Sequence, residues 1–341
     1  MNLPSQMRAL VQLGDGFSGT RTGPEIDDLA PFLTLRSVPV PDVGPGQALI
    51  KVHLAAVNPS DIHFIKGEYG QPRSKGMPAG FEAVGEVVAG DTPLMGQRVS
   101  FFATASGAWA EYALTDASRL VPCRPDLSEV AAAGQLVNPL TAIAMFDLVK
   151  EARAESFVLN AAGSQLGKYL IALGKDHGIA PIAVVRRADQ AAPLRALGAA
   201  QVIVSSEEDA LAKAEQTFRN LPPAILLDAV GDQFTADLFF AMPRHATWVN
   251  YGKLATEAPR LTELGQLIFM NKRITGFWLT RWINQAGPDR VRAAFVEIQT
   301  RFVSGTWTTD VAATVPLSQA MTDLPAALAI SDGKVFIDPR R

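Results

Sequence analysis

The chain has 341 residues, of which 48% are hydrophobic and 19% are charged, a balance typical of a globular enzyme with a large core. Its net charge of −3 comes from dispersed charges of both signs, which gives no reason to expect a nucleic-acid partner, and its single cysteine, Cys123, excludes an intrachain disulfide. No run of about 18 uncharged apolar residues predicts a transmembrane helix, and the N-terminus lacks the apolar core of a signal peptide. We therefore expect a cytoplasmic protein without a membrane partner.

The first part of the chain, up to about residue 130, has β character, with short apolar runs between turns. Residues 14–31 are rich in glycine, proline and acidic residues, which predicts a loop. A short helix is expected after Pro59, with Ser60 or Asp61 as its cap. The predicted strands are Met7–Leu13, Ala48–Ala56, Ala83–Val88, Gln97–Phe102 and Trp109–Leu114. Strands at this spacing indicate a β-rich, partly barrel-like domain.

From about Gly134 helices alternate with apolar strands, which predicts an α/β fold with a Rossmann-type, doubly wound parallel sheet. The predicted helices include Leu140–Lys150, Asp189–Leu197, Thr262–Met270 and Pro288–Val303. The predicted strands are Phe157–Leu159, one that starts near Ile182, Gln201–Val204, Ala224–Ala229, Thr247–Tyr251, Ile274–Leu279 and Val311–Val315. We expect residues 133–276 to form a dinucleotide-binding domain, inserted into a discontinuous domain of residues 1–132 and 277–341.

The segment Ser156–Arg187 has the pattern of a strand, a turn of small residues, a helix and a second strand. Gly174 and Gly178 are expected to end the helix. Against the dinucleotide fingerprint G-x-G-x-x-G, the turn retains only the last glycine and has Ala162, Ser164 and Gly167. The residues predicted to bind a pyrophosphate at the helix N-terminus are Gly163, Ser164, Gln165, Leu166 and Gly167. Close packing of strand and helix explains the same small residues equally well.

Arg186 and Arg187 follow the second strand, where an NAD-preferring site places an acid for the ribose hydroxyls. Guanidinium groups pair with phosphate, so these residues favour the 2′-phosphate of NADPH, with Arg186 as the main contact. Asp189 is assigned to capping the helix that follows. A solvated basic corner at a strand end is the alternative interpretation.

The chain passes from a β-rich domain to a Rossmann domain and then back to the first domain. This order resembles the medium-chain dehydrogenase/reductase superfamily over nearly the whole chain. Within its zinc-independent branch, the chain is most similar to the 2-enoyl thioester reductases of the mitochondrial type and to the quinone oxidoreductases. The resemblance implies a GroES-like catalytic domain around the Rossmann domain. The stretches that carry it are 58–62, 67–70, 137–142, 160–167, 184–186, 251–252 and 276–282.

The resemblance also implies roles for individual residues. Tyr69 is the expected proton donor, since a phenol is protonated at neutral pH, and Asn138 and Thr141 are expected to face the nicotinamide and its ribose, with Asn138 orienting Tyr69. The further residues expected at the cofactor are Tyr251, Gly252, Phe277 and Trp278. Those expected at the substrate are Phe81, Trp278, Arg281 and Trp282. Some of these roles have an alternative. Tyr69 could simply pack over a turn, and Asn138 and Thr141 could simply start a helix at an Asn-Pro turn. Trp282 could belong to an aromatic stripe that packs at a dimer edge.

No metal is expected. Structural zinc needs about four clustered ligands, usually cysteines. Asn58 and Phe81 stand where the resemblance implies that alcohol dehydrogenases have catalytic zinc ligands, and neither residue type replaces them. The four histidines are scattered along the chain without a ligand spacing; they are His53, His63, His177 and His245.

The leading hypothesis is an NADPH-dependent reductase of a 2-enoyl thioester, carried by CoA or by an acyl-carrier protein. An NADPH:quinone or enone oxidoreductase is the second hypothesis, and a non-catalytic NADPH-binding protein is the third. Phe81 is bulkier than its counterpart in the reductases, which argues against long acyl chains. We also expect residues 71–77 to form a mobile flap, and we expect a homodimer that pairs through the apolar stretch Ile274–Leu279.

Overall fold

The structure is a computed structural model that describes residues 3–330 and 332–341. The chain divides into two compact units. The first unit comprises the chain up to Val137 together with Phe295–Arg341, and the second comprises Asn138–Ala294. The prediction that residues 133–276 form a separate dinucleotide-binding domain stays a proposal. Within the described ranges, no helix is both long and apolar enough to cross a bilayer.

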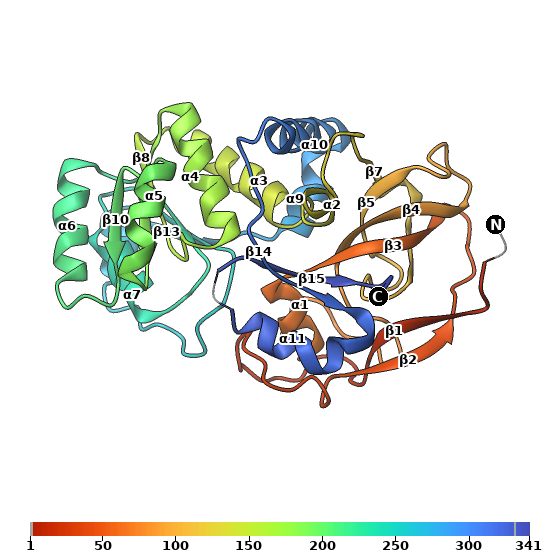
Figure 1. Ribbon diagram of the computed structural model, residues 1–341. Helices are drawn as coiled ribbons and strands as arrows, with labels where there is room; N and C mark the ends of the chain where they lie inside the picture. The colour runs from red at the N-terminus through yellow and green to blue at the C-terminus, as the bar shows by residue number, and fades with distance from the viewer. Residues whose placement is uncertain (1–2, 331) are drawn as a thin grey trace. The chain divides into compact units, whose positions relative to one another are not determined.

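The first unit is built on a mainly antiparallel sheet in which β3 is central (Figure 1). The strand order in the described residues is β14-β15-β3-β4-β5-β7, with β6 also paired to β3, and β1 and β2 form a separate antiparallel pair. The strands are β1 Gln6–Gln12, β2 Leu33–Pro39, β3 Gln47–Val57, β4 Glu82–Gly90, β5 Arg98–Phe102, β6 Tyr112–Asp116, β7 Val121–Pro122, β14 Val311–Pro316 and β15 Lys334–Asp338. The helices are α1 Pro59–Ile65, α2 Glu129–Ala133 and α11 Ala320–Leu328. This arrangement confirms the predicted β-rich domain.

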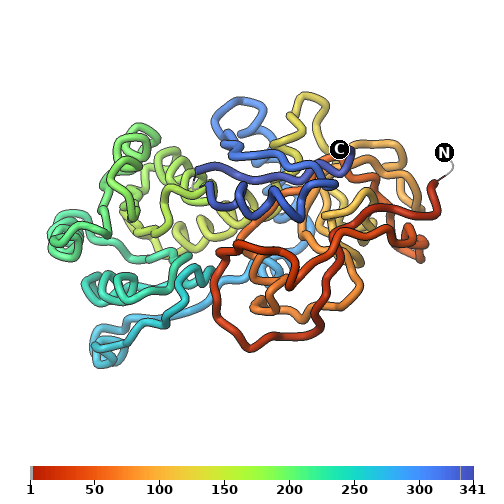
Figure 2. Tube along the Cα trace, turned by 60° about the horizontal axis from the view of Figure 1, so that its bottom comes forward, coloured from red at the N-terminus to blue at the C-terminus, as the bar shows by residue number. Residues whose placement is uncertain are grey.

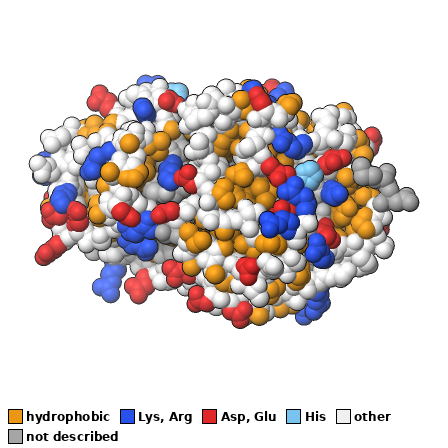
Figure 3. Space-filling model, in the orientation of Figure 1, with side chains coloured by type: hydrophobic (Ala, Val, Ile, Leu, Met, Phe, Trp, Pro, Cys, Tyr) orange, Lys and Arg blue, Asp and Glu red, His pale blue; other side chains and the backbone are white. Residues whose placement is uncertain are grey.

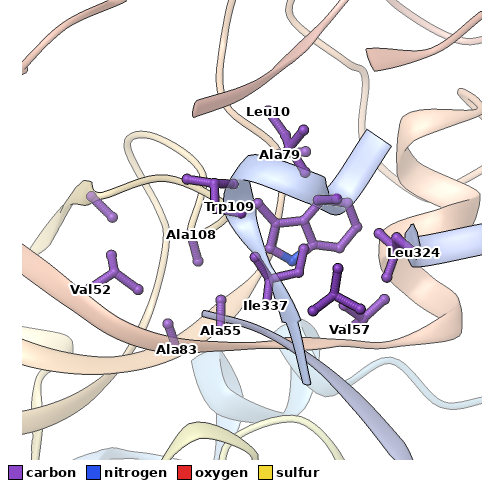
Figure 4. Packing of buried hydrophobic residues seen from close by; sticks show 14 of the residues in the cluster. Leu10, Val52, Ala55, Val57, Ala79, Ala83, Ala108, Trp109, Leu324 and Ile337 are labelled. Carbon is purple, nitrogen blue, oxygen red and sulfur yellow. The ribbon is translucent and has the colours of Figure 1, made fainter. Parts of the chain in front are cut away.

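Trp109 fills the centre of the first unit's core. Its side chain is fully buried, and its indole Nε1 donates to the Ala56 carbonyl at 3.1 Å. Figure 4 shows the indole among apolar side chains from several elements, including Val57 and Leu324. A Cβ added to Gly80 would lie 2.3 Å from this ring, and the φ of +96° also favours glycine there. The core therefore fixes the backbone next to Phe81.

The second unit is built on a parallel sheet with the described strand order β10-β9-β8-β11-β12-β13. Its strands are β8 Ser156–Leu159, β9 Ala180–Val185, β10 Gln201–Val204, β11 Ile225–Asp228, β12 Thr247–Asn250 and β13 Arg273–Gly276. Its helices are α3 Asn138–Glu151, α4 Gln165–His177, α5 Ala191–Leu197, α6 Ala210–Asn220, α7 Gln233–Ala241, α8 Gly265–Phe269 and α9 Leu279–Ala286, and α10 Pro288–Val303 continues into the first unit. Helices α3, α4 and α5 pack in series, and α6 packs on α7 (Figure 1). The predicted Rossmann-type α/β fold is confirmed.

Several predicted element ends were wrong. Gly174 lies inside α4, where its lack of a Cβ allows contact with the Ile179 carbonyl, and the helix ends at Gly178 with a φ of +67°. Asn58 is the N-cap of α1, because Pro59 already occupies the first helical position. Asp61 lies three residues further on and accepts the Asn58 backbone N–H at 2.7 Å.

Other elements differ in extent or were not predicted. The stretch Ile274–Leu279 is strand only up to Gly276, and Trp278 is the N-cap of α9. The helix expected from Thr262 begins at Gly265. The elements without a prediction are β2, β7, β15, α2, α6, α7, α9 and α11.

Candidate functional site

Asp228 organises the carboxyl edge of the parallel sheet, where ligands bind in folds of this type. Its side chain is fully buried at the end of β11. One carboxylate oxygen accepts Asn160 Nδ2 and the Val230 N–H, the latter at 2.8 Å, and the other accepts Trp248 Nε1 and Asn250 Nδ2, both at 2.8 Å. This carboxylate therefore ties β12 to the loops that follow β8 and β11.

The turn after β8 brings the predicted pyrophosphate residues together. A Cβ added to Gly167 would lie 2.5 Å from the Ala162 carbonyl, so the helix approaches the turn after β8 too closely for a side chain. Ser164 is the N-cap of α4, and its hydroxyl accepts the Gly167 N–H at 3.1 Å. Ala161 adopts a left-handed φ of +46°, which is uncommon outside glycine and is concentrated at functional turns. Gly163, Gln165 and Leu166 lie on the same turn and first helical turn, so its geometry fits the pyrophosphate of a dinucleotide.

The two arginines after β9 have different surroundings. Arg186 is exposed, whereas Arg187 is half-buried and its Nε lies 3.2 Å from the Asp189 carboxylate. The prediction that Asp189 caps the next helix was wrong, because a 3₁₀ turn intervenes and α5 begins only at Ala191. Asp189 instead offsets part of the Arg187 charge, which leaves Arg186 as the better-placed partner for an anion.

Tyr251, Gly252 and Phe277 lie at the same edge of the sheet. The Tyr251 N–H donates to the Asp228 carbonyl at 2.8 Å, and the Phe277 N–H donates to the Asn250 carbonyl at 2.9 Å. A Cβ added to Gly252 would lie 2.5 Å from the Ala229 carbonyl. Burial, reinforced by the Asp228 charge, raises the pKa of the Tyr251 phenol, so this group stays protonated.

The remaining predicted residues of the second unit lie on α3 and α9. Asn138 and Thr141 begin α3, and the Thr141 side chain is buried. Trp278 is half-buried before α9, and Arg281 is exposed on that helix. The Arg290 guanidinium lies 5.6 Å from the centre of the Trp282 ring and pairs with Asp147 of α3 at 2.6 Å. Trp282 therefore packs on Arg290 of α10 in the same chain, and its proposed place at the substrate stays a prediction.

In the first unit, Tyr69 and Phe81 meet. Tyr69 is half-buried on the loop after α1, and its ring centre lies 5.3 Å from that of Phe81. Phe64 contacts Phe81 in turn, with 5.0 Å between ring centres. Phe81 is thus held between aromatic rings, with its backbone fixed by the core at Gly80.

A cavity of about 180 Å³ lies beside this aromatic cluster within the first unit. Its lining includes Gln12, Phe64, Gln71, Ser74, Phe81 and Ser106. Drug-sized ligand pockets are larger, from about 300 Å³ upward. The cavity therefore suits a compact group with one aromatic wall and polar side chains around it.

Asn58, which stands where the resemblance implies a zinc ligand in alcohol dehydrogenases, belongs to a buried cluster whose charges compensate one another. Glu82 is fully buried; one oxygen accepts Asn58 Nδ2 at 2.9 Å and the other accepts the Val137 N–H at 2.8 Å. Lys334 Nζ donates to Asn58 Oδ1 and lies 3.5 Å from Glu82. An amide and an ammonium cation beside one carboxylate do not fit a zinc ion. Across the described ranges, no group of three or more His, Cys, Asp or Glu side chains is arranged to hold a metal.

Two family matches cover most of the chain. Residues 44–126 match the alcohol dehydrogenase GroES-like domain family, and residues 166–297 match the family described as zinc-binding dehydrogenase. The latter description names a metal that the donor set around Glu82 does not fit.

Similar proteins point to two activities. A crystal structure from Mesorhizobium loti, provisionally assigned as an NADPH:quinone reductase, is 45% identical, with a TM-score of 0.95 and coverage of 99% of this chain and 100% of that one. The mitochondrial enoyl-[acyl-carrier-protein] reductase of Bos taurus is 28% identical over 334 residues, which span 95% of this chain and 86% of the relative. Its counterpart in Arabidopsis thaliana is 31% identical over 275 residues, which span 76% of this chain and 71% of the relative.

Proposed function

The chain belongs to the medium-chain dehydrogenase/reductase superfamily, and from this premise we propose that it uses NADPH to reduce the activated C=C bond of a 2-enoyl thioester. The observation that carries the proposal is the Tyr69 ring packed on Phe81, whose side chain lines a compact cavity. A quinone accepts electrons without a positioned proton donor, whereas an enoyl thioester needs a donor at its α-carbon. The small cavity favours a short acyl chain such as crotonyl.

NADPH would be held by the second unit. The turn of Gly163, Ser164, Gln165, Leu166 and Gly167 would bind the pyrophosphate at the N-terminus of α4. Arg186, with a smaller contribution from Arg187, would bind the 2′-phosphate. Tyr251, Gly252, Phe277 and Trp278 would contact the rest of the cofactor, and Asn138 and Thr141 would face the nicotinamide ribose. When bound, NADPH supplies the hydride that adds to the β-carbon of the substrate.

Tyr69 supplies the proton in this scheme. Hydride addition moves negative charge onto the thioester oxygen, and the α-carbon then takes the proton of the Tyr69 hydroxyl, which water replaces after turnover. Phe81 would form the wall against which the acyl group packs. Arg281 and Trp282 are the proposed contacts for the outer part of the thioester, although Arg290 covers one face of the Trp282 ring.

The proposal is tested by following NADPH absorbance with crotonyl-CoA, longer enoyl-CoA esters, enones and quinones. We expect turnover with crotonyl-CoA and a decline as the acyl chain lengthens. Turnover with quinones and none with any enoyl thioester would instead support the quinone reductase activity, which the relative from Mesorhizobium loti favours. No NADPH oxidation with any of these compounds would support a non-catalytic NADPH-binding protein.

We also propose a homodimer formed through the edge strand β13. The side chains of this strand are all exposed, and among the described strands it pairs only with β12. Large apolar side chains are exposed near it, with Ile268 and Phe269 each 74% exposed and Ile274 40% exposed. An edge strand with an apolar border can pair with a second copy of itself across a two-fold axis. The expected cytoplasmic location stays a prediction.

A further inference from the structure

Glu68, the residue before Tyr69, is anchored to a loop far earlier in the chain. Its side chain has no exposed surface. One carboxylate oxygen accepts the Thr20 hydroxyl, the Thr22 backbone N–H and the Thr22 hydroxyl, each at 2.8 Å. Burial alone would raise the pKa of this carboxyl, but the hydrogen bonds from Thr22 and Thr20 and the contact with His63, 3.5 Å from the other oxygen, lower it to about 2. Glu68 is therefore ionised and held from one side by the N-terminal loop, residues 14–25.

Arg73 anchors the other end of the segment that carries Tyr69. Its guanidinium donates to the backbone carbonyls of Asp15, Gly16 and Ile65, each at 3.1 Å. The backbones of Arg73 and Gly16 also exchange hydrogen bonds, at 3.1 and 3.2 Å. These contacts hold the N-terminal end of the predicted mobile flap, residues 71–77. They direct the Arg73 guanidinium to backbone carbonyls of the same chain.

The segment between these anchors, residues 67–73, is short and closely packed, and we name it the Tyr69 loop. Gly67 has a φ of +76°, and a Cβ there would lie 2.6 Å from the Arg73 guanidinium. The Gly67 carbonyl accepts the Ser18 N–H at 3.0 Å. Figure 2 shows the N-terminal loop, drawn in red, running beside the orange segment that contains the Tyr69 loop. The N-terminal loop thus contacts the Tyr69 loop on both sides of the tyrosine.

We propose that Glu68 and Arg73 are positioning residues that hold the Tyr69 phenol for proton donation, with the N-terminal loop as their support. This inference rests on the proposed function, because it gives Tyr69 the proton. A proton donor must be within hydrogen-bond reach of the reacting carbon, and loss of about 1 Å in placement costs about 100-fold in rate. Neither residue needs to touch the substrate.

The test compares Arg73→Ala and Glu68→Ala with wild type, using crotonyl-CoA turnover and hydrogen–deuterium exchange of the peptide that contains Tyr69. We expect kcat for crotonyl-CoA to fall by about tenfold or more, with KM for NADPH and quinone turnover changed by less than about twofold. Exchange in the Tyr69 loop should rise about tenfold, while exchange in β8 and α4 stays as in wild type. Glu68→Gln keeps an acceptor for the threonines and should restore most of kcat.

Arg36→Ala is the matched control, because Arg36 is an exposed arginine on β2 of the same unit. It should leave both readouts unchanged. Unchanged exchange in the Tyr69 loop of Arg73→Ala and Glu68→Ala overturns the inference, as does an equal loss of crotonyl-CoA and quinone turnover. If wild type does not reduce enoyl thioesters at all, the proposed function fails, and the exchange measurement still decides whether these residues hold the loop.

Discussion

Arg186 is the exposed cation that follows β9, and its partner in sequence, Arg187, already pairs with Asp189. Arg186→Ala should therefore raise KM for NADPH about tenfold or more and leave KM for NADH almost unchanged, because only NADPH carries the 2′-phosphate. Steady-state kinetics with both cofactors measure this. Arg195→Ala, which removes an exposed arginine from α5, is the control. An equal loss with both cofactors would show that Arg186 supports the fold or the pyrophosphate instead.

Glu68 also predicts a dependence of stability on pH. Its pKa is lowered to about 2 in the folded chain from the ordinary value of 4.5, so its ionised form stabilises the fold above pH 4.5, and the contribution is lost as the pH falls toward 2. Glu68→Gln should lower the free energy of unfolding at pH 7 by roughly 1–3 kcal/mol. Urea unfolding at pH 7, 4 and 3 should show this difference shrinking as the pH falls. A difference that is constant with pH would contradict the assignment.

Individual residues also show what local sequence reasoning misses. Asp228 ends a strand that the sequence predicts, and an acid at the end of an apolar parallel strand is a signal that could have identified it. The cluster of Asn58, Glu82 and Lys334 joins residues up to 276 positions apart, so no spacing in the sequence reveals it. The link between Arg73 and Asp15, which lie 58 positions apart, is hidden for the same reason. The mobility of residues 71–77 stays a prediction.

At the scale of elements, the strand–turn–helix unit around Gly167 gives a further prediction. Gly167→Ala places a Cβ 2.5 Å from the Ala162 carbonyl, which should push α4 away from the turn that follows β8. We expect a loss of about 1–3 kcal/mol in stability together with weaker NADPH binding. Denaturant unfolding and a fluorescence titration with NADPH measure the two effects.

Gly178→Ala is the control at the other end of α4. Nothing lies within 4 Å of a Cβ there, but its φ of +67° disfavours alanine. This variant should lose about 1 kcal/mol of stability and keep wild-type NADPH affinity. If Gly167→Ala also bound NADPH with wild-type affinity, Gly167 would serve only the close packing of α4 on the turn.

Element types were predictable where periodicity was strong, as for β3, α3, α4 and β9. The ends of helices and strands were less predictable, because they depend on caps and contacts rather than on the periodic pattern. Gly174 illustrates the difference: glycine suggested a helix end, whereas here it admits the Ile179 carbonyl inside α4. The exposed β13 is shorter than its apolar stretch because the chain turns into α9 after Gly276.

At the scale of the whole molecule, charge gives no reason to expect a large charged partner. Figure 3 shows acidic and basic side chains interspersed on the face in view, consistent with the net charge of −3. The matched families cover 44–126 and 166–297, which leaves the N-terminal loop outside both matches. The N-terminal loop that contacts the Tyr69 loop therefore lies outside the two matched ranges.

The proposed dimer gives the prediction that belongs to this scale. Phe269→Glu should convert a dimer to a monomer, because it places a charge among the exposed apolar side chains beside β13. Light scattering after size-exclusion chromatography measures the mass. Val296→Glu is the control, since Val296 is 64% exposed but lies on α10. A wild-type protein that stays monomeric at all concentrations would contradict the proposal.

The most direct test of the central claim is the effect of Tyr69→Phe on two substrates. This change removes only the phenolic hydroxyl and keeps the ring that packs on Phe81. The account predicts that kcat with crotonyl-CoA falls by about 100-fold or more while turnover of a quinone stays within about twofold of wild type. If Tyr69→Phe turned over crotonyl-CoA at the wild-type rate, the account would be contradicted, because the proton would then come from another group.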